Sequence, residues 1–281
     1  MSWFEGFDSQ SFEVNGASIF ARYSHRAVGD TIKPALLLLH GFPQSHVMWH
    51  RVARLLAPHY FLVMPDLRGY GDSSKTPGLP DHSNYSKRNL AHDMAGVMQA
   101  LGIESFKVCG HDRGGRVAHR LALDHPERVE QLCVIDIAPT LDMYEGRTLT
   151  APYMEFARSY YHWFHMLQPT PLPELMMGAN HPELAHAYLH AKLGGWGSQG
   201  LGYIEPEALR EYERCFVRPR PFTPPARTTA PALASTWCMI AKAVRVASGS
   251  PAICWCSGAN AVWCTACSTR SRFGKRNAGA W

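Results

Sequence analysis

Short apolar runs alternate with stretches of helical periodicity along the first half of the chain. Two short runs are continuously apolar, at residues 35–39 and 60–64, and two more are mostly apolar, at residues 106–110 and 132–137. Runs this short are typical of strands that are covered by helices on both faces. Three other stretches repeat apolar residues at helical spacing, at residues 49–56, 90–101 and 117–122. The alternation predicts an α/β fold with a mostly parallel, doubly wound sheet and right-handed crossovers.

Two further segments complete the predicted architecture. Residues 12–23 alternate apolar and polar positions around Asn15-Gly16, a dipeptide that favours the tight turn of an antiparallel hairpin. From about residue 145 to 215 the sequence is aromatic and helix-prone, without a strand-like run. We expect a core domain over residues 1–144 and a helical cap over 145–215, above the sheet edge where α/β proteins bind ligands.

The charge of the chain is unevenly distributed. The formal net charge is +5, yet all 23 acidic residues and all 15 histidines precede residue 216. The positive excess therefore belongs to residues 216–281 and does not indicate a nucleic-acid or anionic-membrane partner for the rest. No apolar run reaches the length of about 18 residues expected of a membrane span, and the chain does not open on a basic and then apolar leader. We expect a cytoplasmic protein without a nucleic-acid or membrane partner, and leave a homodimer open.

The segment GHDRGG, residues 110–115, lies between a predicted buried strand and a predicted helix. It fits the pattern G-x-nucleophile-x-G of a strained strand-to-helix turn, with Asp112 at the nucleophile position. A carboxylate there can displace a leaving group from carbon and form an ester that water then cleaves. The alternative is a helix-capping aspartate in an ordinary turn. We favour the nucleophile because HGFP, residues 40–43, follows an earlier strand where an oxyanion-binding amide is expected.

Four stretches together point to a known family. They are HGFPQSHVMW (40–49), PDLRGYGDSS (65–74), GHDRGGRVAHRLALDHPERV (110–129) and IDIAPT (135–140). Over about residues 3–216 the chain resembles the fluoroacetate/haloacetate dehalogenases of the α/β-hydrolase superfamily. The resemblance implies an α/β-hydrolase fold with a helical cap, and hydrolysis of a haloacetate to glycolate and halide through an aspartyl ester. It implies no metal or organic cofactor.

The residue after the nucleophile separates this family from its relatives. Haloalkane dehalogenases and epoxide hydrolases usually carry tryptophan there, whereas this chain has Arg113. Arg113 and Arg116 are three residues apart, so they rise from one side of the first helical turn. By themselves they are also compatible with ordinary surface arginines. The resemblance implies that they bind the carboxylate of a small haloacid substrate, which suits their fork of donors.

The resemblance implies further roles within the same region. Asp136, at the end of a predicted strand, matches the acid that orients the catalytic histidine, and His162 and Trp163 match the halide-binding donors. Their alternatives are a strand-end aspartate and aromatic packing inside the cap. The backbone amides of Phe42 and Arg113 are the expected oxyanion donors.

Residues 216–281 do not continue this pattern. The mechanism needs a histidine after the last strand to activate water, and the family has a tyrosine in a Cys-x-Asp-Tyr-Arg segment beyond the cap. This chain has no histidine after His190 and no tyrosine after Tyr212. The spacing of Cys254, Cys256, Cys264 and Cys267 could indicate a zinc site. However, a stretch of this length without acid, histidine or tyrosine is atypical of a globular domain.

Back-translation gives another interpretation of this tail. Reading from the third nucleotide of the codon for Pro221, the sequence IHATCEDYRAGA can emerge, and the same offset from Ile253 can give LLVLWGERGVVHRLFDPLALWQAEC. Both resemble the family's missing sequence, so we predict a frameshift near residue 216 that removes the C-terminal strand–helix units of the core. Two alternatives stay open: an epoxide hydrolase that uses Tyr160 and Tyr161 as acids, or an inactive product of a shifted gene.

Overall fold

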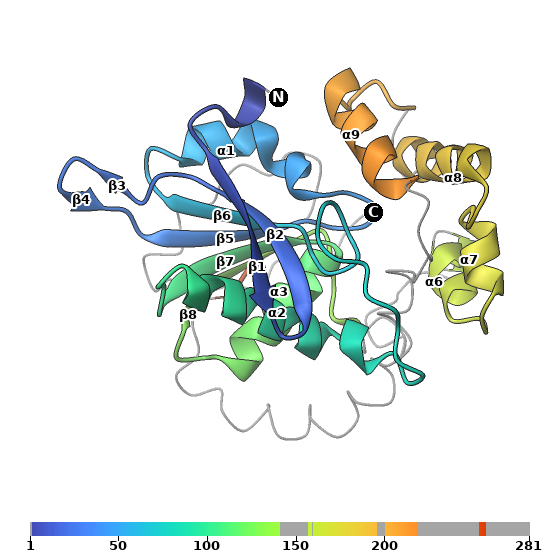
Figure 1. Ribbon diagram of the computed structural model, residues 1–281, viewed down its shortest axis with the longest axis horizontal. Helices are drawn as coiled ribbons and strands as arrows, with labels where there is room; N and C mark the ends of the chain where they lie inside the picture. The colour runs from blue at the N-terminus through green and yellow to red at the C-terminus, as the bar shows by residue number, and fades with distance from the viewer. Residues whose placement is uncertain (1, 141–156, 159, 196–199, 218–252, 257–281) are drawn as a thin grey trace, which may run out of the picture.

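A seven-stranded sheet organises the molecule. The computed structural model describes residues 2–140, 157–158, 160–195, 200–217 and 253–256 (Figure 1). The strand order is β1-β2-β6-β5-β7-β8-β9. The strands are β1 (Asp8–Val14), β2 (Ala17–Tyr23), β5 (Ala35–Leu39), β6 (Phe61–Pro65), β7 (Phe106–His111), β8 (Val129–Ile135) and β9 (Ile253–Cys256). The four predicted core strands match β5, β6, β7 and β8, with shifts of a few residues at their ends.

The N-terminal hairpin forms one edge of this sheet. β1 pairs with β2 in antiparallel register, and β2 pairs antiparallel with β6. Asn15 and Gly16 have φ values of 49° and 70°, the positive values that the predicted two-residue turn requires. The hairpin prediction is therefore confirmed. From β6 through β9 all neighbouring strands run parallel.

Helices cover both faces of the parallel strands, as predicted. In Figure 1, α1 (His50–Leu56) lies on one face, and α2 (Lys87–Ala100) and α3 (Arg113–Asp124) lie on the other. Alternate residues of β5 serve the two faces: Leu37 and Leu39 pack into the core beneath α2 and α3, whereas Leu36 and Leu38 pack with the core beneath α1. Because both faces of β5 and β6 are buried, these two strands have no polar side and consist of continuous apolar runs.

A second group of helices lies beside the sheet (Figure 1). It comprises α6 (Tyr161–Met166), α7 (Leu172–Met176), α8 (Pro182–Gly195) and α9 (Pro206–Phe216). Leu189 of α8 and Tyr212 of α9 pack with the core residues beneath α1, which fixes these two helices to the sheet. Within the described part of residues 145–215, the regular elements are helical; the domain boundaries themselves stay a prediction.

The C-terminal edge of the sheet differs from expectation. We expected no strand–helix unit after the cap, but β9 pairs in parallel with β8 from Leu132 opposite Ile253 to Ile135 opposite Cys256. The physical reason is that β8 would otherwise present unpaired backbone groups, which an extended apolar segment satisfies. The expectation of a missing strand is thus wrong for these four residues. The remaining tail, including the proposed Cys254…Cys267 pattern beyond Cys256, lies outside the described residues.

Smaller elements complete the described chain. They are η1 (Ser2–Phe4), η2 (His46–Trp49), η3 (Ser83–Tyr85), β3 (Ala27–Val28) and β4 (Thr31–Ile32). None of the helices in the described ranges combines the length and hydropathy needed to cross a membrane.

Candidate active site

The turn between β7 and α3 holds Asp112 in a strained conformation. Its φ and ψ are 49° and −117°, a combination that L-residues adopt only when surrounding structure enforces it. The flanking glycines explain how the turn closes. A Cβ atom on Gly110 would lie 2.3 Å from the carbonyl oxygen of Gly114, and one on Gly114 would lie 2.4 Å from that of Leu39. The motif therefore needs both glycines for packing reasons.

Replacing Gly110 with alanine should destabilise the protein. The new methyl group would overlap the backbone of α3, which cannot move as a flexible side chain can. We expect a loss of about 3 kcal/mol or more in the free energy of unfolding, measured by urea denaturation. Gly195→Ala is the matched control, since nothing lies within 4 Å of its Cβ position. Equal stability of the two variants would contradict this account of the turn.

The side chain of Asp112 does not cap the helix that it precedes. It occupies the N-cap position of α3 without a side-chain capping hydrogen bond. Its Oδ2 instead accepts a hydrogen bond of 2.9 Å from the backbone N–H of Phe42. The close approach needs Gly41, where a Cβ would lie 2.6 Å from the Cβ of Asp112. The helix-capping alternative is therefore wrong. The backbone N–H of Phe42, one of the two expected oxyanion donors, points at the Asp112 carboxylate.

The loop that carries Phe42 is fixed by a buried polar network. The carboxylate of Asp66 accepts hydrogen bonds from the backbone N–H groups of His46, at 2.7 Å, and Asp72, at 2.9 Å. The backbone N–H of Leu67 donates to Nε2 of His40 at 3.0 Å. These contacts join two sequence stretches that lie far apart in the chain. They hold the Phe42 amide in place before any ligand binds.

Asp112 is surrounded by cationic groups. Burial by itself raises the pKa of this carboxyl, but His111, Arg116 and Arg113, together with the Phe42 hydrogen bond, outweigh burial and lower the pKa below its usual value. Asp112 is consequently ionised at neutral pH. An ionised carboxylate is the form that a nucleophilic attack requires.

Arg113 is buried beside Asp112, at the first position of α3. Its guanidinium lies 4.9 Å from the centre of the Phe42 ring, donates to the hydroxyl of Tyr70 at 3.3 Å and to the sulfur of Met166 at 3.0 Å. Met166 belongs to α6, so this arginine contacts both the core and the cap. Its backbone N–H begins a helix, where amide groups lack intrahelical acceptors. The geometry is compatible with both predicted roles of Arg113.

Arg116 connects the strand-to-helix turn at residues 110–115, the nucleophile elbow, to the predicted halide donors. Its Nε donates to the carbonyl of Ala138 at 3.1 Å, and its guanidinium lies 4.1 Å from the centre of a Trp163 ring. Arg116 is 6% exposed and Trp163 is 5% exposed. A cation held against an aromatic face in a buried setting is well fixed in orientation. The ordinary surface-arginine alternative is therefore wrong for both arginines.

His162 precedes Trp163 in α6 and is also buried. Burial, reinforced by the positive charges of Lys192 and Arg113, lowers the pKa of His162 to about 3. The imidazole is therefore neutral at physiological pH. A neutral imidazole still offers one N–H donor, which is what the predicted halide-binding role needs.

Asp136 follows β8 and reaches the same region. Its φ of 51° marks a turn directly after the strand, and its side chain is exposed toward a cavity. A relay acid should hold the ring of a histidine. In the part of the chain that the structure describes, no histidine pairs with Asp136. Its predicted position is compatible with the relay role, but its predicted partner is not among the described residues.

A cavity of about 520 Å³ opens above Asp112. It is lined by Phe42, Pro43, Gln44, Met48, His111, Asp112, Asp136, Ile137, Tyr160, Trp163, Lys192, Leu193 and Tyr203. The structure therefore brings Phe42, Asp112, Asp136 and Trp163 together around one space. Arg113, Arg116 and His162 are not among its lining residues. The size suits a drug-sized ligand, so volume alone does not select a two-carbon acid.

Sequence reasoning missed Lys192 of α8, which lines this cavity. Lys192 is 8% exposed, and burial, with a further contribution from Arg113 and opposed by Asp112, lowers its pKa to about 8. Lys87 is a further lysine near this group, and burial, followed by Arg113 and Arg116, lowers its pKa well below the ordinary value. The helical periodicity of α8 could have indicated that Lys192 is buried. Lys192 follows Leu189 by three residues and so lies on the buried side of the helix.

The two tyrosines of the epoxide-hydrolase alternative do not share the cavity. Tyr160 is one of its lining residues. Tyr161 is absent from that lining, is 48% exposed and stacks on His165 at 6.0 Å between ring centres. A pair of acids acting on one epoxide oxygen requires both hydroxyl groups in the same space. This arrangement does not provide that pair.

Comparison with known proteins agrees with this geometry. The sequence matches the family described as alpha/beta hydrolase fold over residues 34–165. A fluoroacetate dehalogenase of Burkholderia sp. is 47% identical over 211 residues, which cover 75% of this chain and 64% of that enzyme. An α/β hydrolase structure from Nostoc sp. PCC 7120 has a TM-score of 0.72 and 46% identity, over 82% of this chain and 74% of that one.

Epoxide hydrolases are more distant. Epoxide hydrolase 4 of Mus musculus is 31% identical over 199 residues, or 70% of this chain and 53% of that protein. The chain thus spans less than two thirds of the length of these two curated relatives. With the sheet order, the elbow and these similarities established, the chain belongs to the α/β-hydrolase family.

Proposed function

We propose that this chain contains the alkylation site of a haloacetate dehalogenase. Asp112 is the nucleophile, Arg113 and Arg116 bind the substrate carboxylate, and His162 and Trp163 donate hydrogen bonds to the departing halide. The fluoroacetate dehalogenase of Burkholderia sp., at 47% identity, supports this assignment. The observation that carries it is the cluster of cations around one ionised carboxylate.

The charge balance of the site favours an anionic substrate. Arg113 and Arg116 lower the pKa of the Asp112 carboxyl, and Asp112 in turn raises that of Lys192. A carboxylate substrate would add a further charge-assisted interaction with these basic groups. A neutral epoxide would not make that interaction. The charges therefore favour the acid as substrate, whereas the cavity volume favours neither.

The first chemical step follows from these positions. An oxygen of Asp112 attacks the α-carbon of the haloacetate, the carbon–halogen bond breaks, and the halide leaves with the bonding electrons. The product is an ester between Asp112 and glycolate. In the second step, water attacks the carboxyl carbon of Asp112, and the Phe42 amide stabilises the negative oxygen that forms. Glycolate leaves with one proton of the water on its hydroxyl oxygen, the other proton passes to solvent, and the Asp112 carboxylate is restored.

We further propose that the second step is impaired in this chain, because residues 216–281 are read out of frame. Activation of water needs a late base, and the last histidine is His190. The alternative reading beginning at Ile253 opens on the strand pattern LLVLW, although the present-frame residues Ile253–Cys256 also pair with β8. Resequencing the gene around the codons for residues 210–222 tests this directly; the present frame, if confirmed, would contradict it.

The substrate class can be tested with the full chain in a single-turnover experiment. Fluoroacetate and chloroacetate should each release up to one equivalent of halide, whereas propylene oxide should give no diol. The reason is that only the acids supply the carboxylate that the cations bind. Diol formation without halide release would instead support the epoxide alternative and overturn the proposal.

Lys192 should make this reaction dependent on pH. Its pKa of about 8 means that it carries a positive charge below that pH and loses the charge as the pH rises. Chloroacetate binding should therefore weaken from about pH 7 to about pH 9. Lys192→Met should bind about tenfold more weakly at about pH 7, equivalent to about 1.4 kcal/mol, and should lack the decline. The concentration dependence of halide release measures both effects; an unchanged decline in Lys192→Met would assign it to another group.

A further inference from the structure

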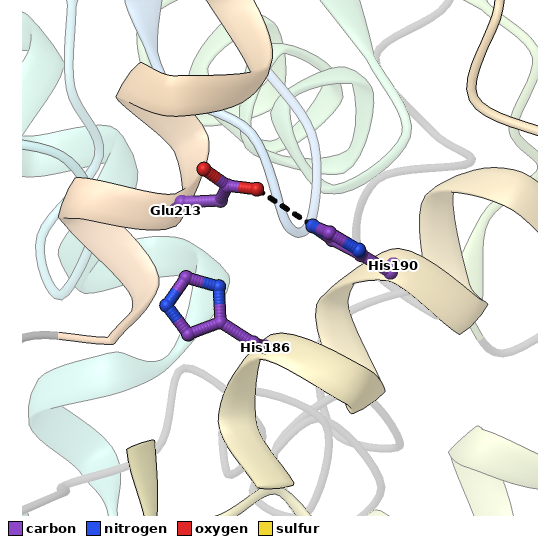
Figure 2. Close-up of side chains that lie close together, drawn as sticks. All are labelled: His186, His190 and Glu213. Atoms are coloured by element: carbon purple, nitrogen blue, oxygen red, sulfur yellow. Dashed lines mark hydrogen bonds and ion pairs between the residues drawn. The ribbon is translucent and has the colours of Figure 1, made fainter. Parts of the chain in front are cut away.

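A cluster of potential metal ligands lies between α8 and α9. His186 and His190 are four residues apart in α8, and Glu213 belongs to α9. Figure 2 shows both imidazoles projecting from successive turns of α8 toward the Glu213 carboxylate. One potential ligand atom from each residue can be chosen so that all three lie within 4.8 Å of one another. These residues are not part of the cavity lining around Asp112.

The local contacts already draw two of these groups together. Nε2 of His190 lies 2.7 Å from Oε1 of Glu213, and the two imidazole rings are 6.1 Å apart between centres and nearly perpendicular. His190 and Glu213 have side-chain exposures of 40% and 22%, so an ion can enter from solvent. His186 makes no contribution to the His190–Glu213 hydrogen bond.

We propose that His186, His190 and Glu213 form a zinc site that joins α8 to α9. Two imidazole nitrogens and one carboxylate oxygen are common zinc ligands, with the fourth position left to water. The i,i+4 spacing places both histidines on one helix face. Zinc–ligand bonds are about 2.0–2.2 Å, so small side-chain rotations would be needed. The distance from Nε2 of His190 to Oε1 of Glu213 would increase slightly, and the imidazole of His186 would move closer to both groups. The ion would replace the hydrogen bond between those two residues.

Zinc at this position would fasten a wall of the catalytic cavity to the core. α8 carries Lys192 and Leu193, which line the cavity, whereas Ala208 and Tyr212 of α9 pack with the core beneath α1. Because zinc would bind the folded arrangement of two helices, it should stabilise the folded state. The expected signature is an increase in the unfolding temperature on addition of zinc.

The test is calorimetric titration of the full chain with ZnCl₂, compared with His186→Ala. This substitution removes one ligand but leaves the His190–Glu213 hydrogen bond intact. We expect binding to weaken by at least about 100-fold, since losing even an outer-shell partner of a metal can cost that much. His181→Ala is the matched control, because His181 is a 60% exposed histidine directly before α8. It should bind zinc as the parent does, and zinc should raise the unfolding temperature of both but not of His186→Ala.

The cysteines of residues 238–267 require one additional measurement. Co²⁺ bound to thiolates gives a charge-transfer absorption that two imidazoles and a carboxylate do not. We expect His186→Ala to remove part of the Co²⁺ absorption of the parent chain. That part should not include the thiolate charge-transfer band. Equal zinc affinity of the parent and His186→Ala, no binding by the parent, or a thiolate band that disappears in His186→Ala would each overturn the proposed site.

Discussion

Asp112→Asn should abolish halide release from chloroacetate. The amide is nearly the same size as the carboxylate, so the turn and its hydrogen bond from Phe42 can persist. It lacks the negative oxygen that must displace the halide. We expect the rate of the first step to fall by at least about 10⁴-fold, in line with the loss of nucleophiles in other hydrolases. Rapid-quench measurement of chloride gives this rate directly.

The matched control for this variant is Asp136→Asn. Asp136 lines the same cavity, but its proposed role belongs to ester hydrolysis, so the first step should be nearly unaffected. Far-ultraviolet circular dichroism of both variants establishes that each retains the fold. Halide release by Asp112→Asn at the parent rate would refute its assignment as the nucleophile.

Restoring the reading frame near residue 216 should convert a single reaction into repeated turnover. The present chain has no histidine after His190, and a positioned general base contributes about 10²–10⁴-fold to such a step. We therefore expect the restored chain to hydrolyse the ester at least about 10²-fold faster. The measurement is chloride release beyond one equivalent per protein.

Two comparisons make this result interpretable. The restored chain carrying Asp112→Asn should again release no halide, which would tie turnover to the same nucleophile. Alkylation in the first step should be at least as fast in the restored chain as in the present chain. If the present chain already turned over as fast as the restored chain, the proposed defect would be wrong.

Much of the sheet and the elbow could be predicted because local sequence patterns determine them. The continuous apolar run at Ala35–Leu39 coincides with β5, and Asn15-Gly16 forms the expected turn. Gly110 is required by its contact with the backbone of Gly114 in the same turn. In each of these cases the cause lies within a few residues of the pattern or in the period of a regular element.

Other features depend on contacts between distant segments. β9 forms only because β8 offers an edge for pairing, and the sequence of Ile253–Cys256 alone does not indicate that partner. Arg113 contacts Met166 of the cap, and Lys192 reaches the cavity from α8. The helical periodicity of α8 could have predicted that Lys192 lies on a buried face. It could not have predicted that this face lies close to Asp112. Tertiary packing determines which elements that face meets.

We infer that chloroacetate alkylates Asp112 and that the resulting ester persists. Intact-mass measurement of the full chain after incubation with chloroacetate, followed by peptide mapping, examines both points at once. We predict one carboxymethyl ester on Asp112 that is missing from the Asp112→Asn variant. An adduct confined to other residues, or the absence of any adduct, would contradict the assignment of Asp112. Continuous glycolate production without a detectable adduct would contradict the persistent ester.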